Sequence, residues 1–128
     1  MVILLDTHFV IWALAGDGRI SKAHLKLLED PGQLVRVSLA SIWEITIKLS
    51  IGKLKLQASL PETMHNIRAL GFGLLPMEEQ HFFALSALPH HHRDPFDRML
   101  IAQAKHEGMH ILTADKHFKT YDVKLVGG

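Results

Sequence analysis

Four acidic residues stand beside short apolar runs, where folding could bring their carboxylates together. Asp6 directly follows the run at residues 2–5, and Asp115 comes soon after a similar run. Glu44 and Asp97 lie near the starts of helical patterns. Converging carboxylates repel one another unless a hard divalent cation with oxygen ligands neutralises them. The four residues are therefore candidate ligands of Mg²⁺ or Mn²⁺, and the corresponding chemistry is attack of metal-activated water on a phosphodiester.

Each carboxylate also has an ordinary structural interpretation. Asp6 and Asp115 could cap the helices that begin after them. Asp94 is a natural N-cap because a proline, favoured at the first helical position, follows it, and Asp97 stands where a capping box places an acid. Glu44 could be a solvated side chain on an amphipathic helix. Spacing alone leaves both interpretations open.

The elements that must position these acids alternate in type along the chain. Five short apolar runs predict strands, at residues 2–5, 34–39, 72–75, 110–113 and 123–126. Helical patterns fill the segments between them, including a strong one from Asp94-Pro95 to Gly108. This alternation predicts an α/β fold whose parallel sheet is covered by helices on both faces. Such sheets carry their sites at the carboxyl ends of strands, near the point where strand order reverses.

Composition limits the alternatives. The 128 residues suit a single domain, 1–128, and 48% apolar with 21% charged residues is a globular composition. The absence of cysteine excludes thiolate metal sites and disulfides. The formal net charge of +1 does not by itself indicate a nucleic-acid binder. The N-terminal apolar run is too short for a signal peptide or membrane span, so we expect a cytoplasmic protein with no membrane partner.

Four segments together resemble those of the PIN-domain family, and specifically VapC-type toxins of toxin–antitoxin pairs. The segments are residues 4–8, 41–45, 92–104 and 112–115, and the resemblance covers essentially the whole chain. Each segment is weak alone, but their order and spacing are specific. The resemblance implies a three-layer α/β/α sandwich with strand order 3-2-1-4-5. Strands one and four would then be neighbours, which would place Asp6 beside Asp115.

The resemblance also implies a function. It suggests an Mg²⁺- or Mn²⁺-dependent endoribonuclease that acts on RNA, forms a homodimer and is inhibited by a cognate antitoxin. The acidic quartet carried over from the family is Asp6, Glu44, Asp97 and Asp115, as metal ligands and catalytic residues. Thr7 and Thr113 match hydroxyl positions that support the quartet, and Asp94 is a second-choice ligand or a cap.

Basic and aromatic residues offer weaker predictions. Arg93, Arg98 and Lys48 could contact RNA, or could pair with carboxylates or face solvent. The run His90–His92 could touch RNA phosphate or a partner, or form a solvated loop, whereas three consecutive loop side chains rarely face one metal ion. Trp12 and Trp43 are expected in the core or a dimer interface and not as base-stacking platforms.

Two other functions are compatible with parts of the pattern. A PIN-like module could bind RNA or an antitoxin without cleaving anything. Such a module is expected to lack one of the four acids, and this chain has all four. A phosphatase of the haloacid-dehalogenase type also has an aspartate after its first strand. Those enzymes need a second acid two residues later, where this chain has His8.

Overall fold

Four parallel strands form the central sheet of the computed structural model, which describes residues 1–127. The strands are β1 (Val2–Leu5), β2 (Leu34–Ser38), β3 (Gly73–Leu75) and β4 (His110–Leu112). Their order is β3-β2-β1-β4, and all pairs are parallel. Leu5 pairs with Leu112 and Ser38 with Leu75, so the strands end at the same edge of the sheet. β2 and β3 lie on one side of β1, and β4 lies on the other. The boundary between β1 and β4 is therefore the point where strand order reverses.

Within residues 1–127, six α-helices and one 3-10 helix accompany the strands. They are α1 (Thr7–Ala15), α2 (Lys22–Glu29), α3 (Leu39–Ser50), α4 (Leu60–Ala69), α5 (Glu79–Ser86), α6 (Pro95–Glu107) and the 3-10 helix η1 (Lys116–Thr120). Serine and aspartate caps fix most of their starts, as in the capping box of Ser59 and Glu62. Gly16 and Gly108 end α1 and α6 with positive φ angles of 64° and 71°, which glycine adopts without strain.

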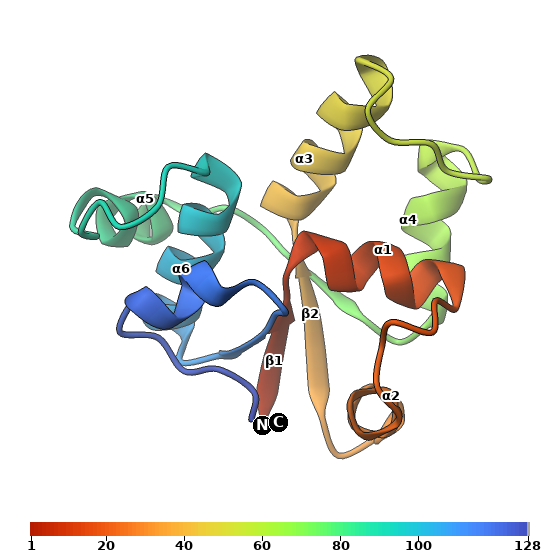
Figure 1. Cartoon of the computed structure of the whole chain (residues 1–128), viewed down its shortest axis with the longest axis horizontal. Coiled ribbons are helices and arrows are strands. Elements are labelled where there is room, and N and C mark those ends of the chain that lie inside the picture. The colour runs from red at the N-terminus through yellow and green to blue at the C-terminus, as the bar shows by residue number, and fades with distance from the viewer. Residues whose placement is uncertain (128) are drawn as a thin grey trace.

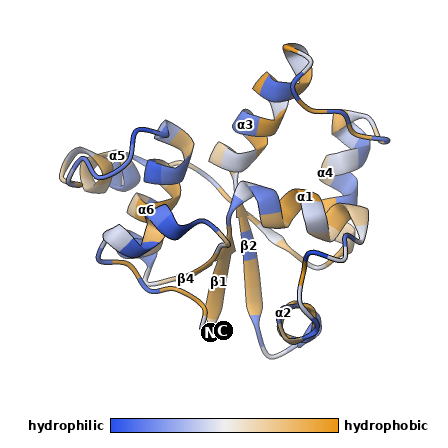
Figure 2. Cartoon of the chain, viewed as in Figure 1, coloured by the Kyte–Doolittle hydropathy of each residue, from blue (hydrophilic) through white to orange (hydrophobic). Residues whose placement is uncertain are grey.

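The helices cover both faces of the sheet and give the predicted three layers. Figure 1 shows α1 to α4 gathered on one side and α5, α6 and the C-terminal segment on the other. Ile3 and Leu5 pack with one buried cluster beneath the first group, and Leu4 packs with a second cluster beneath α6. All three are 0% exposed, which explains why this strand is apolar throughout instead of alternating. The hydropathy colouring in Figure 2 shows the same apolar strands between amphipathic helices.

The predicted fifth strand at residues 123–126 is not a full strand. The segment lies beside β4 through an isolated parallel bridge between Ile111 and Leu125. Two hydrogen bonds hold it there, from Ile111 N to Lys124 O and from Val126 N to Ile111 O, each 2.9 Å long. Two bonds centred on one residue make a bridge and not a ladder. The segment nevertheless occupies the place that the order 3-2-1-4-5 assigns to strand five, and the predicted fold is confirmed.

The other predicted strands and helices are confirmed within a few residues at their ends. The predicted domain 1–128 includes Gly128, which lies outside the described residues. Within residues 1–127, no helix combines the length and apolar character that crossing a membrane requires.

Candidate active site

Asp6 and Asp115 meet where β1 and β4 end side by side. The backbone N–H of Asp6 donates to the Leu112 carbonyl at 3.1 Å, which fixes the end of β1 against β4. The Thr113 hydroxyl donates to Asp6 Oδ2 at 2.5 Å and accepts from the Asp115 backbone N–H at 3.0 Å. Thr113 therefore bridges the two acids, in keeping with the support predicted for its hydroxyl.

Asp6 is both a helix cap and a buried acid. Its Oδ1 accepts the backbone N–H of Phe9 at 3.0 Å, so it is the N-cap of α1. The residue is only 3% exposed. Burial raises the pKa of Asp6, and the charge of Asp115 adds to the rise, while hydrogen bonds from Thr113 and Phe9 oppose it. The cap leaves Oδ2 turned toward Thr113, so the structural and functional interpretations are compatible.

Glu44 is not the solvated side chain that its helical position allows. It is 5% exposed on α3. The Thr7 hydroxyl donates to Oε1 at 2.8 Å, and Lys48 Nζ contacts Oε2 at 2.7 Å. The Ser41 hydroxyl lies 3.0 Å from the Thr7 oxygen and is the donor in that contact, because the single Thr7 proton goes to Glu44. Because Thr7 adjoins Asp6 in sequence, this hydroxyl links Glu44 to the strand that carries the first acid.

Asp94 and Asp97 have separate roles at the start of α6. Asp94 Oδ1 accepts the backbone N–H groups of Phe96 and Asp97 at 2.9 and 3.0 Å, so Asp94 is the N-cap. Asp97 does not reach back as a capping box would, and its Oδ2 instead accepts from His92 Nε2 at 3.0 Å. Burial, followed by the nearby charge of Asp94, raises the pKa of Asp97 to about 6, against the opposing hydrogen bond from His92.

The charge of Glu44 also contributes to the raised pKa of Asp97. This contribution means that α3 and α6 bring their acids within electrostatic reach of each other. Asp115 differs from the other acids because it is more exposed. Desolvation would raise the pKa of Asp115, but hydrogen bonds from the backbone and ring of His117, at 2.9 and 2.8 Å, lower it.

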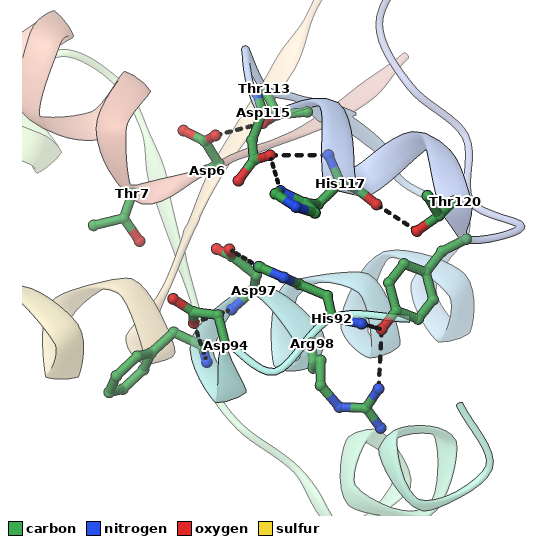
Figure 3. A network of polar contacts seen from close by, with 12 residues as sticks. Asp6, Thr7, His92, Asp94, Asp97, Arg98, Thr113, Asp115, His117 and Thr120 are labelled. Carbon is green, nitrogen blue, oxygen red and sulfur yellow. Dashed lines mark hydrogen bonds and ion pairs between the residues drawn. The ribbon is translucent and has the colours of Figure 1, made fainter. Parts of the chain in front are cut away.

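Two histidines complete the cluster. The rings of His92 and His117 stack with their centroids 4.4 Å apart and an angle of 11° between their planes. Figure 3 shows Asp6, Asp97 and Asp115 turned toward a common space, with the stacked rings along its border. Sequence reasoning missed His117 altogether. Its signal was position, since it follows Asp115 by two residues in a short helix and can reach back to the cap.

The three loop histidines have different surroundings. His90 is exposed, His91 packs edge-on against Tyr121 with centroids 5.1 Å apart, and His92 faces Asp97. Only His92 thus joins the acidic cluster. Ligand atoms of His92, Asp94 and Asp97 lie within 4.8 Å of one another, as do those of His92, Asp115 and His117.

Arg98 is mostly buried, unlike the exposed Arg93. It is 8% exposed, and its guanidinium donates to the Pro89 carbonyl at 2.7 Å and to the Tyr121 hydroxyl at 3.0 Å. Its hydrogen bonds are thus used inside the protein, and we no longer expect it to contact RNA. Arg93 is exposed beside the site, and Lys48 is paired with Glu44.

The tryptophans also differ from each other. Trp43 is 54% exposed and packs edge-on against Phe96, with centroids 5.2 Å apart. It is therefore not a core residue. Trp12 is half-buried and packs against Phe9, with the Arg19 guanidinium 5.5 Å from its ring centre.

The chemistry of the donors fits a hard divalent cation. Asp6, Asp97 and Asp115 supply carboxylate oxygens, and Glu44 adds a fourth with hydroxyl support. Burial, together with the charge of Asp115 for Asp6 and of Asp94 and Glu44 for Asp97, raises the pKa values of these two acids, and a bound cation would oppose that rise. Oxygen-rich sites favour Mg²⁺ or Mn²⁺ over softer metals.

Comparison with known proteins agrees with the fold. A family model described as PIN domain matches residues 3–124. Among solved structures, VapBC2 from Rickettsia felis, bound to a DNA fragment from its promoter, has a TM-score of 0.72 at 14% identity. That match covers 99% of this chain and 98% of the other.

Two further solved structures are similar. VapBC-1 from nontypeable Haemophilus influenzae has a TM-score of 0.67 at 18% identity, with 98% and 97% of the two chains covered. FitAcB from Neisseria gonorrhoeae has a TM-score of 0.65 at 21% identity, with 98% and 96% covered. At these identities the likeness concerns the fold. No curated protein matches the chain.

Proposed function

This chain belongs to the PIN-domain family, and on that premise we propose that it is a metal-dependent endoribonuclease. Proteins of this family are generally nucleases and generally use a divalent metal. The proposed reaction is hydrolysis of RNA phosphodiester bonds by water. The proposed cofactor is Mg²⁺ or Mn²⁺, held by Asp6, Asp97 and Asp115 with Glu44 close by.

The observation that supports this proposal most strongly is the convergence of acids from separate elements. The Thr113 hydroxyl contacts the Asp6 carboxylate and the backbone N–H of Asp115, and the charge of Asp115 reaches Asp6, although 109 positions separate the two acids in the chain. The charge of Glu44 on α3 reaches Asp97 on α6. A fold gains no stability from crowding like charges, so such a cluster favours a functional explanation.

The residues would divide the work among them. The bound cation would lower the pKa of a water molecule and stabilise negative charge on the phosphate oxygens. Thr113 orients Asp6 through its hydrogen bond to Oδ2. Thr7 holds one oxygen of Glu44, and Lys48 holds the other and partly balances its charge. These contacts preorganise the carboxylates before substrate arrives.

We further propose that the protein is the toxin of a toxin–antitoxin pair. The solved structures it resembles include VapBC2, VapBC-1 and FitAcB, which supports an antitoxin as its protein partner. A homodimer and a cytoplasmic location belong to the same proposal.

The test is cleavage of a mixed RNA pool in Mg²⁺, Mn²⁺ and EDTA by wild type and Asp6→Asn. The asparagine oxygen can still accept the cap N–H of Phe9, while its amide NH2 stands where Oδ2 accepted from Thr113 and can donate to that hydroxyl after the hydroxyl turns, so the variant removes the charge with little change in shape. Asp30→Asn is the matched control, because Asp30 accepts a comparable local hydrogen bond from Gly32 in an exposed turn. We expect metal-dependent cleavage by wild type and Asp30→Asn, and a loss of at least about 100-fold in Asp6→Asn.

Cleavage by Asp6→Asn at the wild-type rate would contradict the assignment of the metal site. An absence of metal-dependent cleavage in all proteins, together with Mn²⁺ binding no better in wild type than in a variant lacking all four acids, would favour the non-catalytic module.

A further inference from the structure

The stacked histidines occupy a defined place between two of the acids. His92 precedes α6, and His117 lies in η1, so the stack joins segments on either side of β4. Each ring also contacts one carboxylate, His92 through Nε2 to Asp97 and His117 through Nδ1 to Asp115. Figure 3 shows the two rings lying against each other with their carboxylates on the same side.

We propose that His92 and His117 form a positioning pair that holds the Asp97 and Asp115 carboxylates for the metal ion. The inference rests on the proposed metal site but assigns roles that the acidic quartet does not include. Neither histidine is proposed as a metal ligand or as a group that touches RNA.

The hydrogen bonds explain how the pair would act. A carboxylate accepts, so the ring nitrogen beside it is the donor, at 3.0 Å for Asp97 and 2.8 Å for Asp115. Each bond engages one oxygen and limits rotation of the carboxylate, while the other oxygen stays available. Metal-ligating carboxylates are commonly held this way, and loss of such a partner costs about 10–100-fold in metal affinity.

The stack makes the two bonds interdependent. His117 alone is a mobile support, because its side chain is 60% exposed, whereas His92 is 19% exposed. The face-to-face contact lets the better-buried ring restrict the more exposed one. Movement of either ring would therefore loosen the partner ring's carboxylate as well, but to a smaller extent than loss of the hydrogen bond itself.

The protein also anchors the backbone of His92. Its N–H donates to the Tyr121 hydroxyl at 2.9 Å, and Arg98 donates to that same hydroxyl at 3.0 Å. Arg98 also donates to the Pro89 carbonyl at 2.7 Å, at the start of the loop that carries His92. This bracing gives Arg98 a structural role in the same device.

Paired substitutions separate the hydrogen bond from the stack. His92→Gln retains a donor near the place of Nε2 but has no ring, whereas His92→Phe retains a ring and has no donor. His117→Asn and His117→Phe make the same comparison, since the asparagine amide lies near the place of Nδ1. His90→Phe and His90→Gln are the matched controls, because His90 is an exposed neighbour in the same loop.

The measurement is Mn²⁺ affinity by isothermal titration calorimetry, with the melting temperature of the metal-free protein recorded for every variant. We expect both phenylalanine variants to bind Mn²⁺ about 10–100-fold more weakly. We expect His92→Gln and His117→Asn to stay within about fivefold of wild type, and the His90 variants within about twofold. The double variant His92→Phe/His117→Phe should lose less affinity than the product of the two single losses, because the pair acts as a unit.

Unchanged Mn²⁺ affinity in both phenylalanine variants would overturn the positioning role. Equal loss in the phenylalanine and amide variants would also overturn it, since rings that ligate the ion directly, or that only hold the fold, would give that pattern.

Failure of the proposed function would give a different result. If wild type binds Mn²⁺ without cleaving RNA, nuclease activity is contradicted, whereas the affinity comparison still decides the role of the histidines. If wild type binds no Mn²⁺, both proposals fall.

Discussion

Removing the charge of Asp97 should stabilise the metal-free protein at neutral and alkaline pH. Burial, and then the charges of nearby acids, raise the pKa of this carboxyl from 3.8 to about 6 in the folded state. A carboxyl whose folded pKa is raised contributes stability below its unfolded pKa and loses that contribution as pH rises through the folded value. The window for Asp97 is therefore about pH 4 to 6. Above about pH 6, Asp97 is ionised in its buried position, which lowers the free energy of unfolding. Asp97→Asn has no charge there and avoids this loss.

The size of the effect follows from the shift. About two pKa units correspond to at most about 3 kcal/mol. The Asp97 side chain is 17% exposed, so solvent screening reduces the expected gain in stability to about 1–2 kcal/mol. In a chain of this length, that gain raises the melting temperature by about 3–8 °C. Asparagine still offers an oxygen to His92, which keeps the comparison close to one of charge alone.

The assay is urea unfolding of wild type and Asp97→Asn in EDTA between pH 4 and 8. The difference in unfolding free energy should be near zero at pH 4 and should grow through pH 6 in favour of the variant. Asp115→Asn is the control of opposite sign, because hydrogen bonds from His117 lower the pKa of Asp115 and its ionised form stabilises the fold. A difference that does not change with pH, or an Asp97→Asn protein less stable than wild type at pH 8, would refute the reasoning.

Two further predictions concern stability and assembly. The buried Ser38 hydroxyl donates to Gln103 Oε1 at 2.6 Å and accepts the backbone N–H of Ala40 at 3.0 Å, which caps α3. Ser38→Ala removes both hydrogen bonds. We expect a loss of about 2 kcal/mol with Mn²⁺ affinity unchanged, and a loss below about 0.5 kcal/mol in chemical unfolding would contradict it. The proposed homodimer predicts a light-scattering mass twice that of the 14.4 kDa chain, and a concentration-independent monomer would refute it.

The sequence predicted the arrangement of the fold because its signals are local. Apolar runs such as residues 2–5 can be buried on both faces only in a covered parallel sheet. Caps and terminal glycines, such as Ser59 and Gly108, mark helix ends through hydrogen bonds between near neighbours. The predicted strand at 123–126 failed because strand pairing depends on a distant partner, and here Ile111 offers only a bridge.

The candidate site divides in the same way. Residue types and strand ends were enough to single out the four acids as candidates, and the family resemblance added the supporting threonines. They were not enough to decide what each side chain contacts. Spacing suits Asp94 to the N-cap and Asp97 to a capping box, and only the folded turn shows that Asp97 meets His92 instead.

The sequence by itself thus determined which acids could reach one edge of the sheet, since strand order and chain direction fix where each strand ends. Only the tertiary structure decided the partners of those acids. The stacking of His92 on His117 and the use of Arg98 inside the protein both depend on segments far apart in the chain. Contacts of that kind are set by how α6, η1 and the preceding loop pack together, and packing geometry leaves no periodic or local mark in the sequence.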